Sequence, residues 1–328
     1  MAVRHVGGAQ GPRAGEYDAD VVILALDRAA ETAEAIESAL AQRGVRHHVI
    51  VVDQGSWPDS LARLARAVAG RDATLVTLGG NAGVAAGRNR GAALGRGRVI
   101  VGLDNDAAFD TPHTLAAAVA ALDRDPALEA AGFRILMDET GTDDLLSWGY
   151  PKSLLARAGE AFEATTFVGA GHAIRRAAWE AVGGYDEALF FCWEELDLCL
   201  GLIARGWTVR YRGDIVVRHK VSPERRLDWS GGRWFHFVRN RLYLARKHGT
   251  PWPRILGRGL GYLVKGTRNG LAADSLRALA AAARMSAGLR APPAPALVRA
   301  YLARHDRAHR ANGMARVRDE VLARLPAS

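Results

Sequence analysis

Short apolar runs alternate with amphipathic segments along the first hundred residues. The runs have the length and β-branched content of buried strands, and they occupy residues 21–26, 48–52, 73–78 and 99–103. After the first run, apolar side chains recur at helical spacing, as in Ala33, Ile36 and Leu40. Strands and helices that alternate in this way predict an α/β fold with a mostly parallel sheet and right-handed crossovers.

The pattern continues less regularly beyond this point. Further strand-like runs occupy residues 131–137, 167–174 and 208–217, and helical patterns occupy 111–125, 176–182, 194–205 and 233–247. After residue 250, amphipathic Arg-rich helices are interrupted by Pro292, Pro293 and Pro295. We therefore expect a loose leader over residues 1–18. We also expect an α/β domain over 19–249, in halves 19–107 and 108–249, and a helical extension over 250–328.

The positive charge of the chain is concentrated in this extension. The sequence carries 44 Lys and Arg against 35 Asp and Glu, a net charge of +9, but residues 250–328 alone hold 14 basic and 4 acidic residues. Only four basic residues are lysines, which indicates a compositional bias toward arginine. Because no basic motif is interleaved with aromatic residues, we expect no nucleic-acid partner.

Cysteine usage and hydropathy indicate a cytoplasmic protein. The two cysteines, Cys192 and Cys199, lie in one segment and suggest a reducing compartment without a disulfide framework. Nowhere do 18 apolar residues run together, and no early segment resembles a signal peptide.

The strand over residues 99–103 runs directly into Asp104, Asn105 and Asp106. Ligands of open α/β sheets bind at the carboxyl ends of such strands. Two carboxylates one residue apart repel each other unless a cation lies between them, so the pattern favours a divalent-metal site for a phosphate-bearing substrate. A polar turn after the strand is the competing interpretation.

Two further segments contain candidate chemistry. The segment 79–91 is rich in glycine, which allows close backbone approach to a ligand, and its Arg88 offers a phosphate partner. Glu194, Glu195 and Asp197 follow three aromatic residues at the start of a predicted helix. An apolar wall raises a carboxyl pKa toward the range of a general base, although the helix dipole also favours acids at this position.

The order of these motifs resembles that of family 2 inverting glycosyltransferases with the GT-A fold, which include rhamnosyltransferase-like enzymes. The resemblance covers residues 20 to 247 and rests on Ala25-Leu-Asp-Arg28, Ile50-Val-Val-Asp-Gln-Gly-Ser56, Asn81-Ala-Gly83, Gly87-Arg-Asn-Arg-Gly91, Asp104-Asn-Asp106 and Glu194-Glu-Leu-Asp197. It implies a GT-A fold, a nucleotide-diphospho-sugar donor, Mg²⁺ or Mn²⁺, and transfer of a single sugar to the hydroxyl of a glycan, a lipid-linked intermediate or a small molecule.

The resemblance also implies roles for individual residues. Metal ligands would be Asp104, Asp106 and His219. The nucleotide and donor would contact Ala25, Asp27, Arg28, Asp53, Asn81, Gly83, Arg88, Asn89, Asp104 and Asn105. Donor sugar and acceptor would lie near Gly169, Ala170, Gly171, His172 and Trp193. The base would be Glu195, with Glu194 and Asp197 as the other candidates, because the family usually has Asp where this chain has Glu195.

Two other activities and several roles of the extension stay open. A sugar-phosphate nucleotidyltransferase uses a similar sheet, but it would need a Gly-rich, Lys-containing loop after the first strand, where this chain has Asp27-Arg-Ala-Ala30. A catalytically silent nucleotide-sugar-binding protein would not need the acids. The basic extension could contact an anionic membrane, form a homodimer, cover the acceptor site, or present a solvated arginine face.

Overall fold

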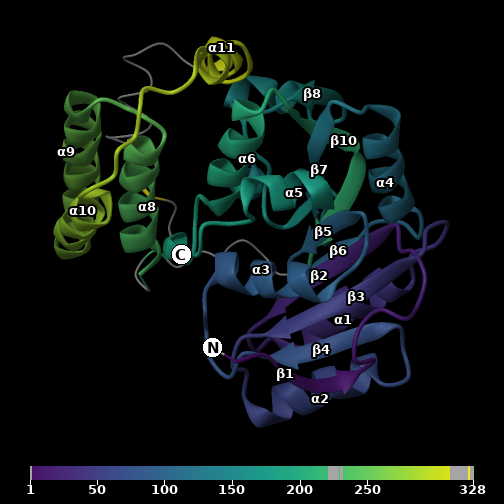
Figure 1. The fold of residues 1–328 in the computed structure, drawn as a ribbon. Helices are drawn as coiled ribbons and strands as arrows, with labels where there is room; N and C mark the ends of the chain where they lie inside the picture. Colours follow the sequence, from purple (N-terminus) through teal and green to yellow (C-terminus); the bar gives the residue numbers. More distant parts are fainter. Residues whose placement is uncertain (1, 221–228, 230–231, 311–323, 326–328) are drawn as a thin grey trace.

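The computed structural model describes residues 2–220, 229, 232–310 and 324–325 (Figure 1). Its centre is a 10-stranded sheet in the order β1-β4-β3-β2-β5-β9-β7-β10-β6, with β8 paired to β10. Strands β2, β3, β4, β5, β7 and β10 point in one direction, which confirms the mostly parallel α/β sheet. The strands are β1 (Arg4–Gly8), β2 (Ala19–Ala25), β3 (His47–Asp53), β4 (Ala73–Thr77), β5 (Val99–Leu103), β6 (Ala107–Phe109), β7 (Leu128–Met137), β8 (Ala161–Glu163), β9 (Gly171–Arg175) and β10 (Thr208–His219).

Helices cover both faces of this sheet. Side chains alternate along β2, so Val21 and Ile23 face one layer while Val22 faces the other. The first layer consists of α1 (Ala29–Leu40), α2 (Pro58–Val68) and α4 (Thr114–Arg124). The second consists of α3 (Val84–Leu94), α5 (Arg176–Val182) and α6 (Glu194–Ala204). Because the strands are buried on both sides, they read as continuous apolar runs in the sequence.

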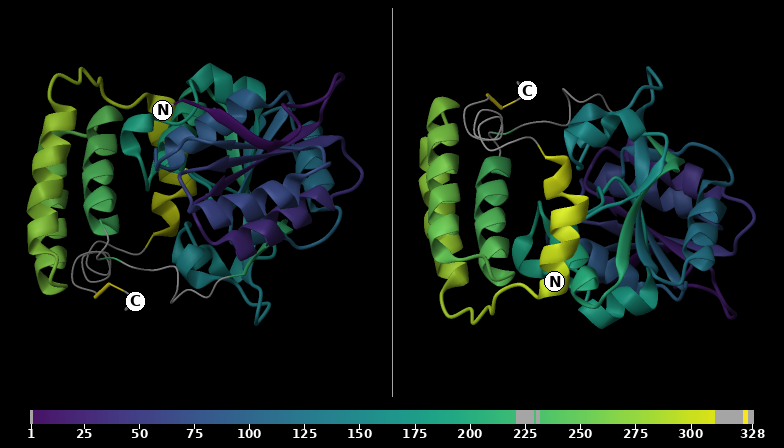
Figure 2. Two further views of the ribbon diagram at one scale, coloured as in Figure 1. Left: turned by 90° about the horizontal axis from the view of Figure 1, so that it is seen from below. Right: turned by 90° about the horizontal axis from the view of Figure 1, so that it is seen from above.

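The C-terminal part is helical, as expected. Helices α8 (Arg233–Lys247), α9 (Trp252–Arg268) and α10 (Ala272–Ser286) pack side by side at one flank of the sheet domain (Figures 1 and 2). Their shared core contains Trp234, whose indole N–H donates to Ser275 Oγ over 2.8 Å. The domain break expected after residue 249 therefore falls between two helices, α8 and α9, that share a core.

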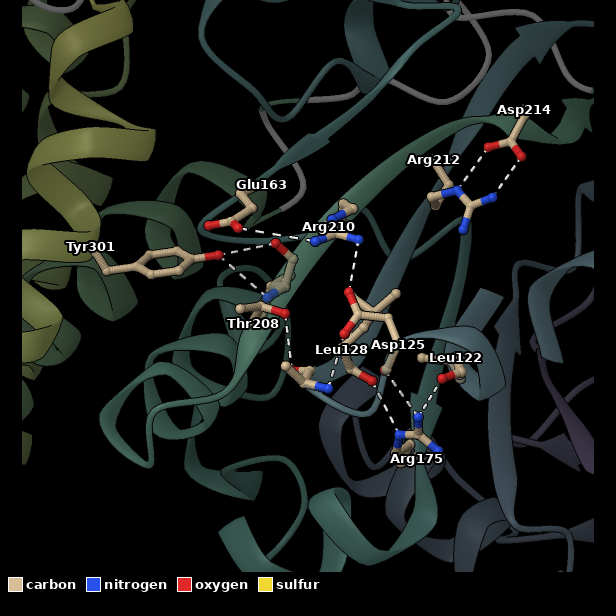
Figure 3. A network of polar contacts seen from close by, with 12 residues as sticks. Leu122, Asp125, Leu128, Glu163, Arg175, Thr208, Arg210, Arg212, Asp214 and Tyr301 are labelled. Atoms are coloured by element: carbon tan, nitrogen blue, oxygen red, sulfur yellow. Dashed lines mark hydrogen bonds and ion pairs between the residues drawn. The ribbon is translucent and has the colours of Figure 1, made fainter. Parts of the chain in front are cut away.

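Helix α11 (Ala296–His305) returns from this bundle to the sheet domain. Val298 packs in the same apolar cluster as α6. Tyr301 points toward Thr208 and Arg210 of β10 (Figure 3). Its hydroxyl lies 3.1 Å from the carbonyl oxygens of Val209, on β10, and Ala164, and can donate to either of them. Arg210, the next residue of β10, is paired with Asp125. The extension thus packs against α8 through α9 and α10, and against the sheet domain through α11.

Three local expectations differ from the structure. Residues 4–8 are not part of a loose leader, because β1 pairs antiparallel with β4 at the edge of the sheet. Residues 208–217, which we interpret from the sequence as a pair of strands, form one strand, β10, whose register with β7 shifts between Arg212 and Val216. The helix expected to open at Thr111-Pro112 begins at Thr114. Among the described helices, none combines the length and apolar content needed to cross a bilayer.

Candidate active site

The two aspartates after β5 lie beside the end of β10. Antiparallel pairing of β6 with β10 sets His219 opposite Ala107, the residue that follows Asp106. One ligand atom each from Asp104, Asp106 and His219 lies within 4.8 Å of the others. Two carboxylates and an imidazole at this spacing suit a divalent cation such as Mn²⁺ or Mg²⁺. The structure therefore brings together the three residues predicted to bind metal.

The imidazole of His219 is oriented by a residue that the sequence analysis did not single out. Its Nδ1 donates to Asp144 Oδ2 over 2.6 Å, and both side chains are buried. This bond leaves Nε2 available to a cation, the arrangement common for metal-binding histidines. Asp144 lies in an acidic turn of the sequence, but only the fold shows that this turn meets the end of β10.

Two arginines pair with the aspartates. Arg28 Nη1 lies 2.9 Å from Asp106 Oδ2, and Arg88 Nη2 lies 2.9 Å from Asp104 Oδ1. Arg88 is buried and also donates to the carbonyl oxygens of Val22, Leu103 and Gly169, so it connects α3 to the end of β5 at the candidate metal site. Both arginines were predicted to contact the donor, and both lie beside the candidate metal site.

The turn that carries Arg28 is held in an unusual conformation. Asp27 and Arg28 have φ values of 52° and 47°, in the left-handed region that non-glycine residues rarely adopt. Asp27 is fixed on both sides, since its amide donates to Ser56 Oγ and its carboxylate accepts from the Trp57 amide. Strained backbone of this kind is typical of functional sites. Ala25 is buried, and its carbonyl oxygen accepts from the Gln54 amide.

The remaining residues predicted to contact the donor mainly shape loops. Asp53 is buried and accepts from the amides of Gly55 and Ser56 and from the Thr77 hydroxyl. Asn81 Oδ1 accepts from the Gly83 amide, and Gly83 has a φ of 86°. A Cβ at Gly83 would lie 2.4 Å from Phe190 O, so this glycine lets the loop approach the segment before α6.

Two of the predicted donor contacts form side-chain bonds within the fold. Asn89 donates to the carbonyl oxygen of Tyr185 and accepts from its amide, so it holds the start of the 185–193 loop. Asn105 Nδ2 donates to Thr32 Oγ1, which ties the turn between the aspartates to α1.

The segment expected to face donor sugar and acceptor has an open part and a buried part. A Cβ at Gly169 would lie 2.6 Å from Glu195 Oε1, so glycine leaves room beside that carboxyl. Ala170 O accepts from the Asp104 amide, and Gly171 begins β9. His172 is buried in the sheet, where it stacks on Phe167 and contacts the Tyr185 hydroxyl at 3.0 Å.

The acids of α6 differ sharply in environment. Burial, with the neighbouring Asp104 charge, raises the pKa of Glu195 to about 7. Burial and Glu195 raise the pKa of Glu194 well above its usual value, and Glu194 Oε2 has no hydrogen-bond partner among the residues that the structure describes. A carboxyl with a pKa near 7 is suited to take a proton at neutral pH.

Asp197, the third candidate base, forms an ion-pair network. Burial alone would raise its pKa, but hydrogen bonds from His248 and Lys247, each 2.7 Å long, lower it overall. Lys247 also pairs with Asp186. Asp197 therefore joins α6 to the end of α8, and of these two carboxyls only Glu195 has a pKa raised toward 7.

The loop that presents these acids is strained and is held by one asparagine. Phe190, Cys192 and Trp193 have φ values of 64°, 71° and 74°. The side-chain nitrogen of Asn240 (Nδ2), on α8, lies 2.8–2.9 Å from the backbone carbonyl oxygens of Leu189, Phe191 and Cys192. The indole of Trp193, an expected acceptor contact, donates to Phe237 O. The sequence analysis did not single out Asn240. In the sequence it is one polar residue within the apolar pattern of the helix over 233–247.

Comparisons with known proteins agree with this geometry. The sequence profile of "Glycosyl transferase family 2" matches residues 20–183. The succinoglycan biosynthesis protein ExoO of Rhizobium meliloti (strain 1021) is 40% identical over 89 residues, which are 27% of this chain. The match covers 25% of the length of that relative.

Solved structures share the fold. The mannosyltransferase PcManGT from Pyrobaculum calidifontis, in complex with GDP-Man and Mn²⁺, has a TM-score of 0.54 at 20% identity, over 89% of this chain and 80% of that one. GalNAc-T7, solved with UDP, GalNAc and Mn²⁺, has a TM-score of 0.55 at 13% identity, over 94% of this chain and 59% of that one. These similarities confirm the GT-A fold. With the profile match across half of the chain, they show that the protein belongs to glycosyl transferase family 2.

Proposed function

We propose that the protein is a metal-dependent inverting glycosyltransferase that moves one sugar from a nucleotide-diphospho-sugar to an acceptor hydroxyl. The observation that carries this proposal is the position of Glu195. Its carboxyl, with a pKa of about 7, lies against Gly169 and beside Asp104 of the candidate metal site. A base and a site for a leaving diphosphate thus share one end of the sheet.

The chain's own residues would divide the work of a one-step displacement. Glu195 takes the proton of the acceptor hydroxyl while the acceptor oxygen bonds to the anomeric carbon. The bond from that carbon to the β-phosphate oxygen breaks, and its electron pair leaves with the nucleoside diphosphate. Asp104, Asp106 and His219 would hold a divalent cation, which supplies positive charge to the leaving group. Arg28 adds positive charge beside Asp106.

The surface of α9 supports peripheral contact with an anionic membrane. Leu256 and Leu260 are 67% and 63% exposed, and Trp252 and Val264 continue the same stripe at four-residue spacing. An exposed apolar stripe on a basic helix is typical of helices that lie in a membrane interface. A homodimer through the same stripe is the second candidate for this surface.

Product analysis tests the proposed reaction. A panel of nucleotide sugars is incubated with the protein and Mn²⁺, with and without EDTA, and with candidate acceptors or water. We expect one donor to release nucleoside diphosphate only with Mn²⁺, and the new glycosidic bond to have the opposite anomeric configuration to the donor by NMR. Retained configuration would contradict inversion, and formation of inorganic pyrophosphate would indicate a nucleotidyltransferase. Donor binding without turnover would indicate a silent binding protein.

A further inference from the structure

A cavity of about 930 Å³ lies between α6 and the helical extension. Its described walls come from α6, α8, α9 and α11 and from the segment around Thr165 and Thr166. Trp193 and Leu196, the residues on either side of Glu194 and Glu195, line it. Thr166 lies three residues before Gly169, which touches Glu195. The cavity therefore adjoins the proposed base from the side of the extension.

The described lining of this cavity is strongly basic. Its one acidic side chain is Asp306, which is paired with Arg310. The basic side chains of the lining, apart from His248, are Arg241, Arg254, Arg258, Lys265, Arg299, Arg307 and Arg310. So many like charges around one cavity repel each other, and an anion inside it would relieve that repulsion.

Several of these guanidinium groups have no acceptor among the described residues. Within the described part of the chain, Arg241, Arg254, Arg258 and Arg307 line the cavity without a side-chain hydrogen bond or ion pair. Arg241 is the most enclosed of them, and its guanidinium lies 5.1 Å from the centre of the Trp193 ring. Burial and the nearby Arg258 lower the pKa of Arg241 to about 10, so it stays charged at neutral pH. Arg241 is half-buried, and the one acidic side chain of the described lining, Asp306, is already paired with Arg310. A partly desolvated charge that shares its counter-ion in this way is costly, and an anion in the cavity would offset that cost.

The other part of the lining is aromatic and aliphatic. Trp229, Trp234, Phe237 and Tyr262 contribute to it, together with Leu200 and Leu302. Cavities of this volume accept ligands of drug size, with apolar walls and a few charged groups that set orientation. A ligand that fits both parts has a multiply charged anionic group and an apolar or ring-shaped remainder.

We propose that this cavity binds the phosphate or diphosphate group of the acceptor and so presents the acceptor hydroxyl to Glu195. Phosphate oxygens match several guanidinium groups at once, because arginine forms paired hydrogen bonds with them. The inference rests on the proposed glycosyl transfer and narrows its acceptor to phosphate-bearing molecules. The charged group is shared by lipid-linked intermediates and by soluble sugar phosphates.

Calorimetric titration with inorganic pyrophosphate tests the cavity separately from the donor site. The protein carries Asp106→Ala and the buffer contains EDTA, so that the donor site makes no metal-dependent contribution. We expect Arg241→Gln and Arg258→Gln each to weaken pyrophosphate binding about tenfold or more, as loss of a charged hydrogen bond does. Arg268→Gln, an exposed residue of α9 outside the cavity, should leave binding unchanged.

The possible results of the titration distinguish the proposed phosphate site in the cavity from the proposed glycosyl transfer. No binding of pyrophosphate, binding unaffected by Arg241→Gln and Arg258→Gln, or equal binding of malonate would overturn the phosphate site. If circular dichroism shows that Arg241→Gln unfolds the protein, the Arg258→Gln variant alone decides the result. Tighter binding of geranyl diphosphate than of pyrophosphate supports a lipid-linked acceptor, and equal affinity supports a soluble sugar phosphate. Pyrophosphate binding in a protein that transfers no sugar would reject the glycosyltransferase function but keep the anion site.

Discussion

At the scale of single residues, the first turn of α6 places three carboxyl groups in different environments. Glu195 lies beside Gly169 with a pKa of about 7, whereas Asp197 pairs with Lys247 and is hydrogen-bonded to His248. Glu194 is buried with an unpartnered oxygen. Neighbouring carboxyls whose environments separate their pKa values are a common way to assign acid and base roles.

Removal of the Glu195 charge tests the assignment of the base. We expect Glu195→Gln to lower kcat by about 10²–10⁴-fold, since a general base contributes that much, with little change in nucleotide binding. Initial rates with the identified donor give this value. Glu180→Gln, an exposed carboxylate on α5, is the control and should keep full activity. Full turnover in Glu195→Gln together with its loss in Glu194→Gln would move the role to Glu194.

The pH dependence of the reaction follows from the same carboxyl. A base acts when deprotonated, so kcat/KM should fall about tenfold per pH unit below about 7 and level off above it. Glu194 and Glu195 titrate as a pair, so the profile reports their joint ionisation. Nucleotide binding measured over the same range separates this effect from protonation of the metal ligands. A flat rate between about pH 5 and pH 8 would be incompatible with a base of this pKa.

Asp144 provides a test of the metal site that leaves its three ligands intact. Asp144→Asn removes the carboxylate that accepts from His219 Nδ1, and loss of such a contact typically weakens metal binding about 10–100-fold. Mn²⁺ affinity measured by electron paramagnetic resonance checks this. The matched control is Asp143→Asn, because the adjacent Asp143 pairs with Arg134 instead. Equal Mn²⁺ affinity in the Asp144→Asn variant and the parent would exclude His219 as a ligand oriented by Asp144.

At the scale of elements, α8 fixes the conformation of the loop before α6. Asn240 bonds to three carbonyl groups of a loop in which three non-glycine residues have positive φ. Such backbone persists only where surrounding contacts impose it. The position of Glu195 therefore depends on a helix that follows it by about 40 residues in the chain.

Asn240→Ala should loosen this loop. We expect a loss of about 1–3 kcal/mol of stability from the unpaired buried carbonyl groups, and a lower kcat with nearly unchanged binding of nucleotide and Mn²⁺. Thermal melting and steady-state kinetics give both values. Ser275→Ala, which breaks a buried hydrogen bond to Trp234 in the same bundle, should lower stability without the same loss of kcat. If the two variants lose stability and kcat in the same proportion, Asn240 has only a structural role.

The parts of the site that lie within one strand or helix were predictable from sequence, whereas contacts between distant elements were not. The strand before Asp104 is a continuous apolar run, the helix over 233–247 has apolar residues at helical spacing, and the structure has both at the predicted bounds. Asp144 and Asn240 act on residues about 75 and 50 positions away, and no local pattern marks such contacts. The edge strand β1 was missed because its sequence, Arg-His-Val-Gly-Gly, lacks the apolar alternation of a strand.

At the scale of the whole molecule, α9 has two differently exposed faces. Arg254, Arg258 and Lys265 line the cavity beside α6, while Leu256 and Leu260 are exposed to solvent. A phosphate-bearing lipid has both chemistries, because its headgroup is anionic and its tail is apolar. Contact of the exposed face with a bilayer would bring the headgroup region close to the cavity and, through Trp193, to the base.

This arrangement predicts that two leucines control membrane binding. The double variant Leu256→Ser and Leu260→Ser should reduce co-sedimentation with phosphatidylglycerol vesicles about tenfold or more, since two exposed leucine side chains no longer enter the interface. High salt should weaken binding of the parent protein by screening its basic residues. Leu145→Ser, a similarly exposed leucine of the sheet domain, is the control.

If the double variant still binds vesicles, the membrane face is rejected. If the double variant shifts from dimer to monomer in light scattering, the stripe is assigned to a homodimer instead. Because the cavity faces away from this stripe, the double variant should still bind pyrophosphate, so the two surfaces of α9 can be tested independently.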